Sequence, residues 1–228
     1  MSSRGEPERN DARLVFWLLT VGAVALLGYA TRFGWIGDDT KPPKDALYRW
    51  DSVVGGVVQF AIFLAIVVAL SGASRDRVAL RAPGSWGRAL GLAAAVFVAS
   101  FFLLGLLDRI FHGGDEQGLT PDAWRPDRAG VFAANFVVVA VVAPIVEELL
   151  FRGIGFHLLE RFGRWTAILL VGLAFGLYHG LVNALPVLAL FGAALAWLRA
   201  RTNSVYPGMF VHAAFNGLAL VLSVTVSN

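Results

Sequence analysis

Residues 129–159, AGVFAANFVVVAVVAPIVEELLFRGIGFHLL, decide the fold class of this chain. The first half of this stretch is apolar, and it then meets Glu147, Glu148 and Arg152 without an intervening turn signal. Apolar runs of about 18 residues or more are candidate membrane-spanning helices. We therefore expect one long transmembrane helix that continues past these charges toward Leu159.

Six further apolar segments flank this stretch, at residues 14–30, 53–73, 89–107, 165–179, 184–198 and 207–226. The chain of 228 residues is 57% hydrophobic and 15% charged, whereas about a quarter of a soluble domain is charged. The predicted fold is an all-α polytopic membrane bundle of seven or eight spanning helices with a cavity inside it. We expect residues 1–13 to be a disordered polar tail, 14–128 accessory helices and loops, and 129–228 the helical core that contains the polar clusters described below.

The fifth apolar segment is too short to span a membrane. Its stretch from Thr166 to Tyr178 is about 20 Å long as a helix, against a hydrocarbon core of about 30 Å. We expect this helix to stop partway, with residues 180–186 forming a turn.

Composition also bears on location and partners. There are no cysteines, which excludes disulfides, thiolate nucleophiles and cysteine-ligated metals. The basic residues sit at helix ends, which favours membrane topology over nucleic-acid binding. Segments on the inner side hold more arginines if the N-terminus is cytoplasmic, so we predict that orientation. The bias toward Arg, Ala, Val and Gly favours a bacterial source, and hence the cytoplasmic (inner) membrane.

Two adjacent carboxylates inside an apolar helix, Glu147 and Glu148, indicate a functional site. A charged residue at the bilayer centre costs about 2.5–3.5 kcal/mol, so such residues are functional by default. Glu148 and Arg152 are four residues apart, with Glu first, which favours an ion pair on one helix face. Glu147 lies about 100° around the helix and faces another wall. The alternative is a solvated helix end at the membrane interface.

Two more polar clusters follow in the later helices. Phe175 and His179 share one helix face, and His212 and Asn216 share a face of the last apolar segment. Each cluster alone is explained by packing hydrogen bonds, but three such clusters in successive apolar segments indicate one buried site. The other two histidines, His112 and His157, fall outside these clusters.

At these residues the sequence resembles the CPBP family, the Abi or CAAX-protease-like membrane proteins. The family pattern is Glu-Glu-x-x-x-Arg, then Phe-x-x-x-His, then His-x-x-x-Asn, and its order and spacings match residues 147–152, 175–179 and 212–216. The resemblance covers about residues 130–226. It implies an intramembrane endopeptidase that acts on a membrane protein or a lipidated peptide.

The resemblance also implies a role for each residue. Glu147 would be the general base, with His179 sharing the attacking water, and His212 and Asn216 would donate hydrogen bonds to the oxyanion. The supporting residues would be Glu148, Arg152 and Phe175. No cofactor is favoured, because the H-E-x-x-H spacing of zinc peptidases is absent. The alternative is a zinc ion held by Glu147, His179 and His212.

Two other function classes stay open. The first is a membrane scaffold or bacteriocin-immunity-type protein that uses the polar cavity only to bind a partner. The second is a proton-coupled transporter, which would thread polar residues across the bundle. The first three apolar segments contain almost no polar residues, so a peptidase is the leading hypothesis.

Overall fold

The computed structural model of the chain describes residues 5–37, 45–113, 116, 121 and 123–225, and every described regular element is a helix. The longer helices are α1 (Gly5–Arg32), α2 (Trp50–Ser71), α3 (Trp86–Phe111), α8 (Arg164–Tyr178), α9 (Leu185–Thr202) and α10 (Tyr206–Thr225). A further helical path comprises η2 (Pro126–Arg128), α5 (Ala129–Val137), η3 (Val138–Val142), α6 (Ala143–Glu147), η4 (Glu148–Gly155), α7 (Phe156–Leu159) and η5 (Glu160–Phe162).

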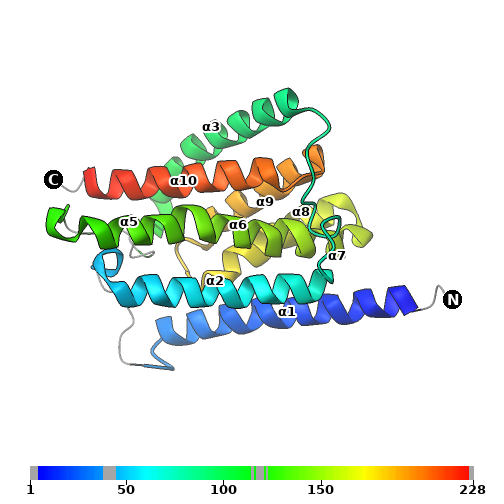
Figure 1. The fold of residues 1–228 in the computed structure, drawn as a ribbon, viewed down its shortest axis with the longest axis horizontal. Helices are drawn as coiled ribbons and strands as arrows, with labels where there is room; N and C mark the ends of the chain where they lie inside the picture. The colour runs from blue at the N-terminus through cyan, green and yellow to red at the C-terminus, as the bar shows by residue number, and fades with distance from the viewer. Residues whose placement is uncertain (1–4, 38–44, 114–115, 117–120, 122, 226–228) are drawn as a thin grey trace.

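This composite helix is the centre of the bundle. It runs without a break over 37 residues from Pro126 to Phe162, about 55 Å as a helix and therefore longer than a bilayer core of about 30 Å. Figure 1 shows it in green between α10 and α2, with α3 beyond α10 and α1 beyond α2. The predicted helix through the carboxylates toward Leu159 is confirmed.

Six helices of the described chain are long and apolar enough to cross a membrane. The six are α1, α2, α3, the composite helix, α9 and α10, while α8 is a shorter apolar helix of 15 residues. The predicted all-α polytopic membrane bundle is confirmed. The predicted end of the fifth helix before residue 180 is confirmed by its end at Tyr178, but the predicted turn over 180–186 is too long, because α9 begins at Leu185. The described residues thus form seven apolar helices, of which six reach spanning length rather than the predicted seven or eight.

The predicted disordered tail is wrong over residues 5–13, because α1 begins at Gly5. A helix need not end where its apolar face ends if polar contacts continue it. Here Arg13 Nη1 donates to Asn10 Oδ1 over 3.2 Å. Asp11 forms an ion pair with Arg161 of η5. Residues 1–4 lie outside the described residues.

Small residues bring α8 and α9 into close contact. A Cβ added to Gly172 of α8 would lie 2.7 Å from Ala193 N and 2.8 Å from Ala189 O of α9. In return, a Cβ on Gly192 would lie 3.0 Å from Gly172 Cα. Only glycine permits this approach, which is the usual way that membrane helices associate without a hydrophobic driving force. The tight hairpin fixes His179, at the end of α8, relative to α9.

Candidate active site

Pro144 shapes the helix just before the two carboxylates. In the preceding π-helix, η3, the Ala143 N–H bonds to Val138 O. In that register the next donor, at Pro144, would bond to Val139 O, but proline has no N–H. Asn216 Nδ2 of α10 donates to Val139 O over 3.0 Å instead. The proline therefore explains both the irregular helix and the position of one predicted site residue.

Glu148 and Arg152 form an ion pair with no solvent exposure. Arg152 Nη1 lies 2.9 Å from Glu148 Oε1, and both side chains are 0% exposed. Arg152 Nη2 donates to Gly192 O of α9 over 2.9 Å, and its guanidinium lies 4.3 Å from the centre of the Phe175 ring. A buried charge is tolerated only when it is paired and hydrogen-bonded. The predicted supporting residues thus meet around one guanidinium.

His212 of α10 joins this pair to Glu147. Its Nδ1 lies 3.2 Å from Glu148 Oε1, and its Nε2 lies 3.7 Å from Glu147 Oε2. Glu147 is 6% exposed and His212 is 3% exposed, so the contact is shielded from solvent. An ionised carboxylate only accepts hydrogen bonds, so Nδ1 is the nitrogen that carries a proton toward Glu148. In the neutral ring Nε2 then has a free lone pair on the side of Glu147.

His179 lies at the end of α8 and is oriented by its own helix. Its Nδ1 lies 2.7 Å from Phe175 O. A carbonyl oxygen only accepts, so Nδ1 holds the proton and Nε2 is the free lone pair of the neutral ring. The Phe175 ring contacts both histidines edge-on, with ring centroids 4.7 Å from His179 and 5.6 Å from His212. Both histidines are thus held by Nδ1 with Nε2 available for chemistry.

The turn that follows His179 is clamped from two directions. Gly180 has a φ of 62°, and a Cβ there would lie 2.7 Å from Gly28 Cα of α1. Arg32 of α1 donates from Nε to Gly180 O over 3.0 Å. The carboxylate of Glu116 accepts from the backbone N–H groups of residues 182, 183 and 184 over 2.9, 2.7 and 3.0 Å. Arg32 and Glu116 are themselves paired at 3.0 Å, so one ion pair holds the turn.

Two residues of the site were missed from the sequence. A Cβ on Gly208 of α10 would lie 2.5 Å from Glu148 Oε2, so this glycine makes room for the carboxylate. The buried Tyr178 hydroxyl has no hydrogen-bond partner among the described residues, and its ring lies edge-on to His179 with centroids 5.3 Å apart. The adjacency of Tyr178 to His179 was the available signal. Nothing in the sequence pairs Gly208 with Glu148.

The predicted residues therefore fall into two groups. Contacts link one group into a single buried cluster, consisting of Glu147, Glu148, Arg152, Phe175, His179 and His212. Asn216 is one turn away on α10 and directs its amide to the backbone of η3 rather than to the carboxylates. His112 caps the end of α3, and His157 lies on α7 beyond the carboxylates.

Metal binding was the alternative for the same side chains. Among the described residues, no group of three histidine, aspartate or glutamate side chains converges in a way that could hold a metal ion. The Nδ1 contacts of His179 to a carbonyl and of His212 to a carboxylate are nevertheless the kind that orient metal-bound histidines.

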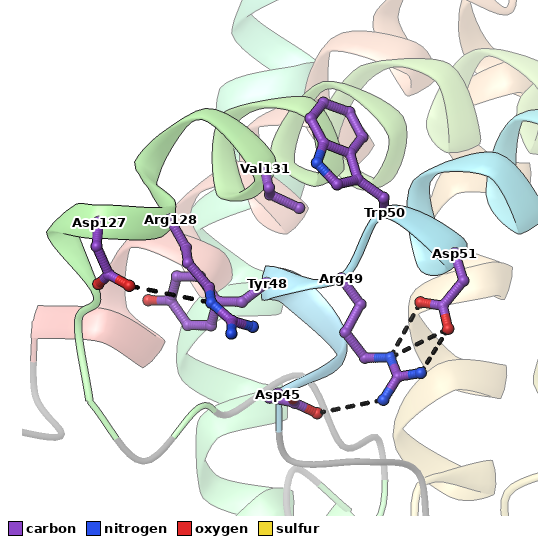
Figure 2. A pocket seen from close by; sticks show the side chains of 8 residues that line it. All are labelled: Asp45, Tyr48, Arg49, Trp50, Asp51, Asp127, Arg128 and Val131. Carbon is purple, nitrogen blue, oxygen red and sulfur yellow. Dashed lines mark hydrogen bonds and ion pairs between the residues drawn. The ribbon is translucent and has the colours of Figure 1, made fainter.

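A cleft of about 460 Å³ on the described surface is remote from these residues. Figure 2 shows it between the segment that precedes α2 and the start of the composite helix. Its charges pair among themselves, Arg49 with Asp45 and Asp51, and Arg128 with Asp127. Because the charged side chains of this cleft pair with one another at the end of the bundle, the buried cluster is the better candidate.

Comparisons with known proteins support a peptidase. Residues 129–218 match the sequence model of the Rce1-like family, described as type II CAAX prenyl endopeptidase Rce1-like. The chain is 24% identical over 215 residues to YdiL of Bacillus subtilis (strain 168), whose name assigns it provisionally as a membrane peptidase. That alignment covers 92% of this chain and 86% of YdiL. No solved structure matches the chain significantly.

Proposed function

Because the chain belongs to the CAAX-protease family of membrane endopeptidases, we propose that it hydrolyses a peptide bond of a membrane-associated protein with water activated by Glu147. The family and the six apolar helices make it an integral membrane peptidase. The identity of the base, the path of the proton and the kind of substrate are the parts proposed here.

The observation that carries the proposal is the unequal pairing of the two carboxylates. The charge of Glu148 is neutralised by Arg152, whose Nη1 lies 2.9 Å from its Oε1, so this carboxylate has a structural role. Glu147 is paired with a histidine rather than with an arginine. Its Oε2 lies 3.7 Å from Nε2 of His212, whose ring can be neutral. A carboxylate without a cationic partner in an apolar cavity is the better proton acceptor of the two. Of these two adjacent residues, Glu147 is therefore the proposed base and Glu148 the supporting residue.

The proposed reaction needs one water molecule. Glu147 takes a proton from this water while its oxygen attacks the carbonyl carbon of the scissile bond, and His179 Nε2 accepts the other O–H to orient it. The tetrahedral intermediate then collapses, the C–N bond breaks, and Glu147 passes its proton to the leaving amine. Water is consumed, and one carboxylate and one amine are formed.

Three donors are available to the oxyanion in this scheme. His212 offers Nε2–H while it holds the proton that Glu147 took from the water, before that proton returns through Glu147 to the leaving amine. Asn216 offers the amide hydrogen not used on Val139 O. We add the Tyr178 hydroxyl, which is buried next to His179 and has no hydrogen-bond partner among the described residues. The removal of one such donor typically costs about 10²–10³ in kcat.

The proposed substrate is a membrane protein or a lipidated peptide cleaved near its C-terminus. The site is buried among apolar helices, so a substrate reaches it most directly from within the bilayer. We further propose that the protein resides in a bacterial cytoplasmic membrane with its N-terminus in the cytoplasm, because arginines gather at the end of the bundle where α1 begins. No nucleic-acid partner is proposed.

The proposal is tested in cells by profiling the C-terminal peptides of membrane proteins. Three strains are compared, with the wild-type gene, a Glu147→Ala variant and a deletion. We expect particular C-termini to persist uncleaved in the variant and the deletion but not in the wild type. If Glu147→Ala restores the wild-type profile to the deletion strain, Glu147 is not the base. If the deletion leaves every C-terminus unchanged but has a phenotype that Glu147→Ala rescues, a scaffold function replaces the peptidase.

We also propose that no metal ion takes part. Treatment of the purified protein with 1,10-phenanthroline is then expected to leave cleavage of the substrates found by profiling unchanged. A loss of cleavage that added zinc restores would instead assign Glu147, His179 and His212 as ligands.

A further inference from the structure

A second cavity opens at the opposite end of the bundle from the cleft in Figure 2. Its volume is about 190 Å³, equivalent to about six water molecules at about 30 Å³ each. It lies between the start of α8 and the end of α9 and is lined by Arg164, Trp165, Ile168, Trp197, Ala200 and Arg201. Drug-sized ligands fill pockets of about 300–1,000 Å³, so this one fits a headgroup-sized ligand.

The charge of this cavity is entirely positive. Arg164 and Arg201 both line it, no carboxylate does, and neither guanidinium forms an ion pair among the described residues. The cleft in Figure 2 is the contrast, because its two arginines are matched by three aspartates. Two unpaired guanidinium groups on one small cavity are a complement for a phosphate, which arginine binds with paired N–H donors.

The aromatic residues of the cavity indicate a membrane interface. Trp165 is 68% exposed although it is a large apolar side chain, and Trp197 forms another part of the wall. The Arg201 guanidinium lies 5.2 Å from the centre of the Trp197 ring, which holds the charge at the cavity edge. Tryptophan is enriched at the level of lipid headgroups, where its ring is half in the apolar phase.

We propose that this cavity binds the phosphate headgroup of an anionic phospholipid, with Arg164 and Arg201 on the phosphate and Ile168 and Ala200 toward the glycerol and acyl region. The site lies where α8 starts and α9 ends, so a bound lipid bridges the two ends of the hairpin that positions His179. The inference does not depend on the peptidase activity, because it rests on the cavity alone.

The test is native mass spectrometry of the purified full-length protein titrated with dioleoyl-phosphatidylglycerol or dioleoyl-phosphatidylcholine. We expect the wild type to retain phosphatidylglycerol in preference to phosphatidylcholine. The double variant Arg164→Gln/Arg201→Gln should bind phosphatidylglycerol about tenfold more weakly or worse, since two charge-assisted contacts are lost. The matched control is Arg75→Gln/Arg88→Gln, which removes two exposed arginines from the same end of the bundle outside the cavity and should bind as the wild type does.

Three results would overturn the proposal. Equal retention of both lipids by the wild type would show that the cavity does not select a lipid of net negative charge. Equal losses in the two double variants would assign binding to general surface charge. Displacement of phosphatidylglycerol by millimolar sodium phosphate alone would make the cavity a site for a free anion rather than a lipid.

Discussion

Glu148 is the residue at which three helices meet. Its Oε1 contacts Arg152 of its own helix and His212 of α10, and its Oε2 lies against Gly208. Arg152 extends the contact to the Gly192 carbonyl of α9. This carboxylate therefore orients the histidine that faces Glu147 and ties together the packing around it.

Removal of Arg152 should leave an uncompensated buried carboxylate. We expect Arg152→Met to destabilise the protein by about 3–5 kcal/mol, the usual cost of breaking one side of a buried pair. The double variant Glu148→Gln/Arg152→Met should recover much of that loss. Thermal unfolding of the detergent-purified proteins measures both. The control is Arg49→Met, whose exposed pair with Asp51 should matter little; equal losses in both variants would contradict the account.

Gly208 should tolerate no side chain. In Gly208→Ala the new methyl group would lie 2.5 Å from Glu148 Oε2, so the carboxylate must move. We expect a loss of about 1–3 kcal/mol in stability together with a loss of cleavage. Gly217→Ala is the matched control on the same helix, since its Cβ would meet the Phe136 ring at an ordinary 3.4 Å. Similar melting temperatures and activities for the two variants would refute this view of Gly208.

At the scale of elements, the site is built by helices that depart from regular geometry. Two π-segments, η3 and η4, lie on either side of Pro144 and Glu147, and such segments are frequent at functional sites. α8 stops short of spanning length and presents His179 at its end. Its partner α9 is held against it by glycine and alanine, which makes the hairpin rigid.

The α8–α9 contact predicts opposite effects for two glycine substitutions. Gly172→Ala would place a methyl group against the α9 backbone and should lower the melting temperature. Gly91→Ala on α3 meets nothing within 4 Å and should be neutral or stabilising by up to about 1 kcal/mol, because alanine favours a helix. The two melting curves decide; a stabilising Gly172→Ala would show that the close approach is not required.

The sequence predicted the helices well because apolar length and spacing are local signals. It also grouped residues that the structure joins by contacts, because Glu148 and Arg152, like Phe175 and His179, are neighbours on their own helices. It did not predict either π-segment; at η3, the carbonyl of Val139 accepts from Asn216 of another helix, a contact that no local pattern indicates. Nor did it predict that Gly28 and Arg32 of α1 support the turn after His179. Residues about 150 positions apart produce no periodic pattern in the sequence when they contact each other.

At the scale of the whole molecule, charge is distributed unevenly between the two ends of the bundle. Arginines at residues 75, 77, 81, 88, 161, 164, 199 and 201 gather at the end where α1 begins. The opposite end mixes Arg49, Arg125 and Arg128 with aspartates. Loops rich in arginine stay in the cytoplasm, so the asymmetry predicts a cytoplasmic N-terminus.

This orientation is testable because the chain contains no cysteine. Single variants Asp127→Cys and Asp76→Cys put one thiol at each end of the bundle, both at exposed positions. In intact spheroplasts a membrane-impermeant maleimide should label Asp127→Cys and leave Asp76→Cys unlabelled until the membrane is opened. The reverse pattern would place the N-terminus outside.

The most direct test of the central claim is the turnover of a substrate found by profiling, with purified protein in lipid nanodiscs and ¹⁸O-enriched water. The wild type should cleave the substrate and place one ¹⁸O atom in the new carboxyl group. Glu147→Gln keeps the shape of the side chain but loses the base, so kcat should fall by about 10²–10⁴. Wild-type turnover by Glu147→Gln would contradict the account and move the base to another residue.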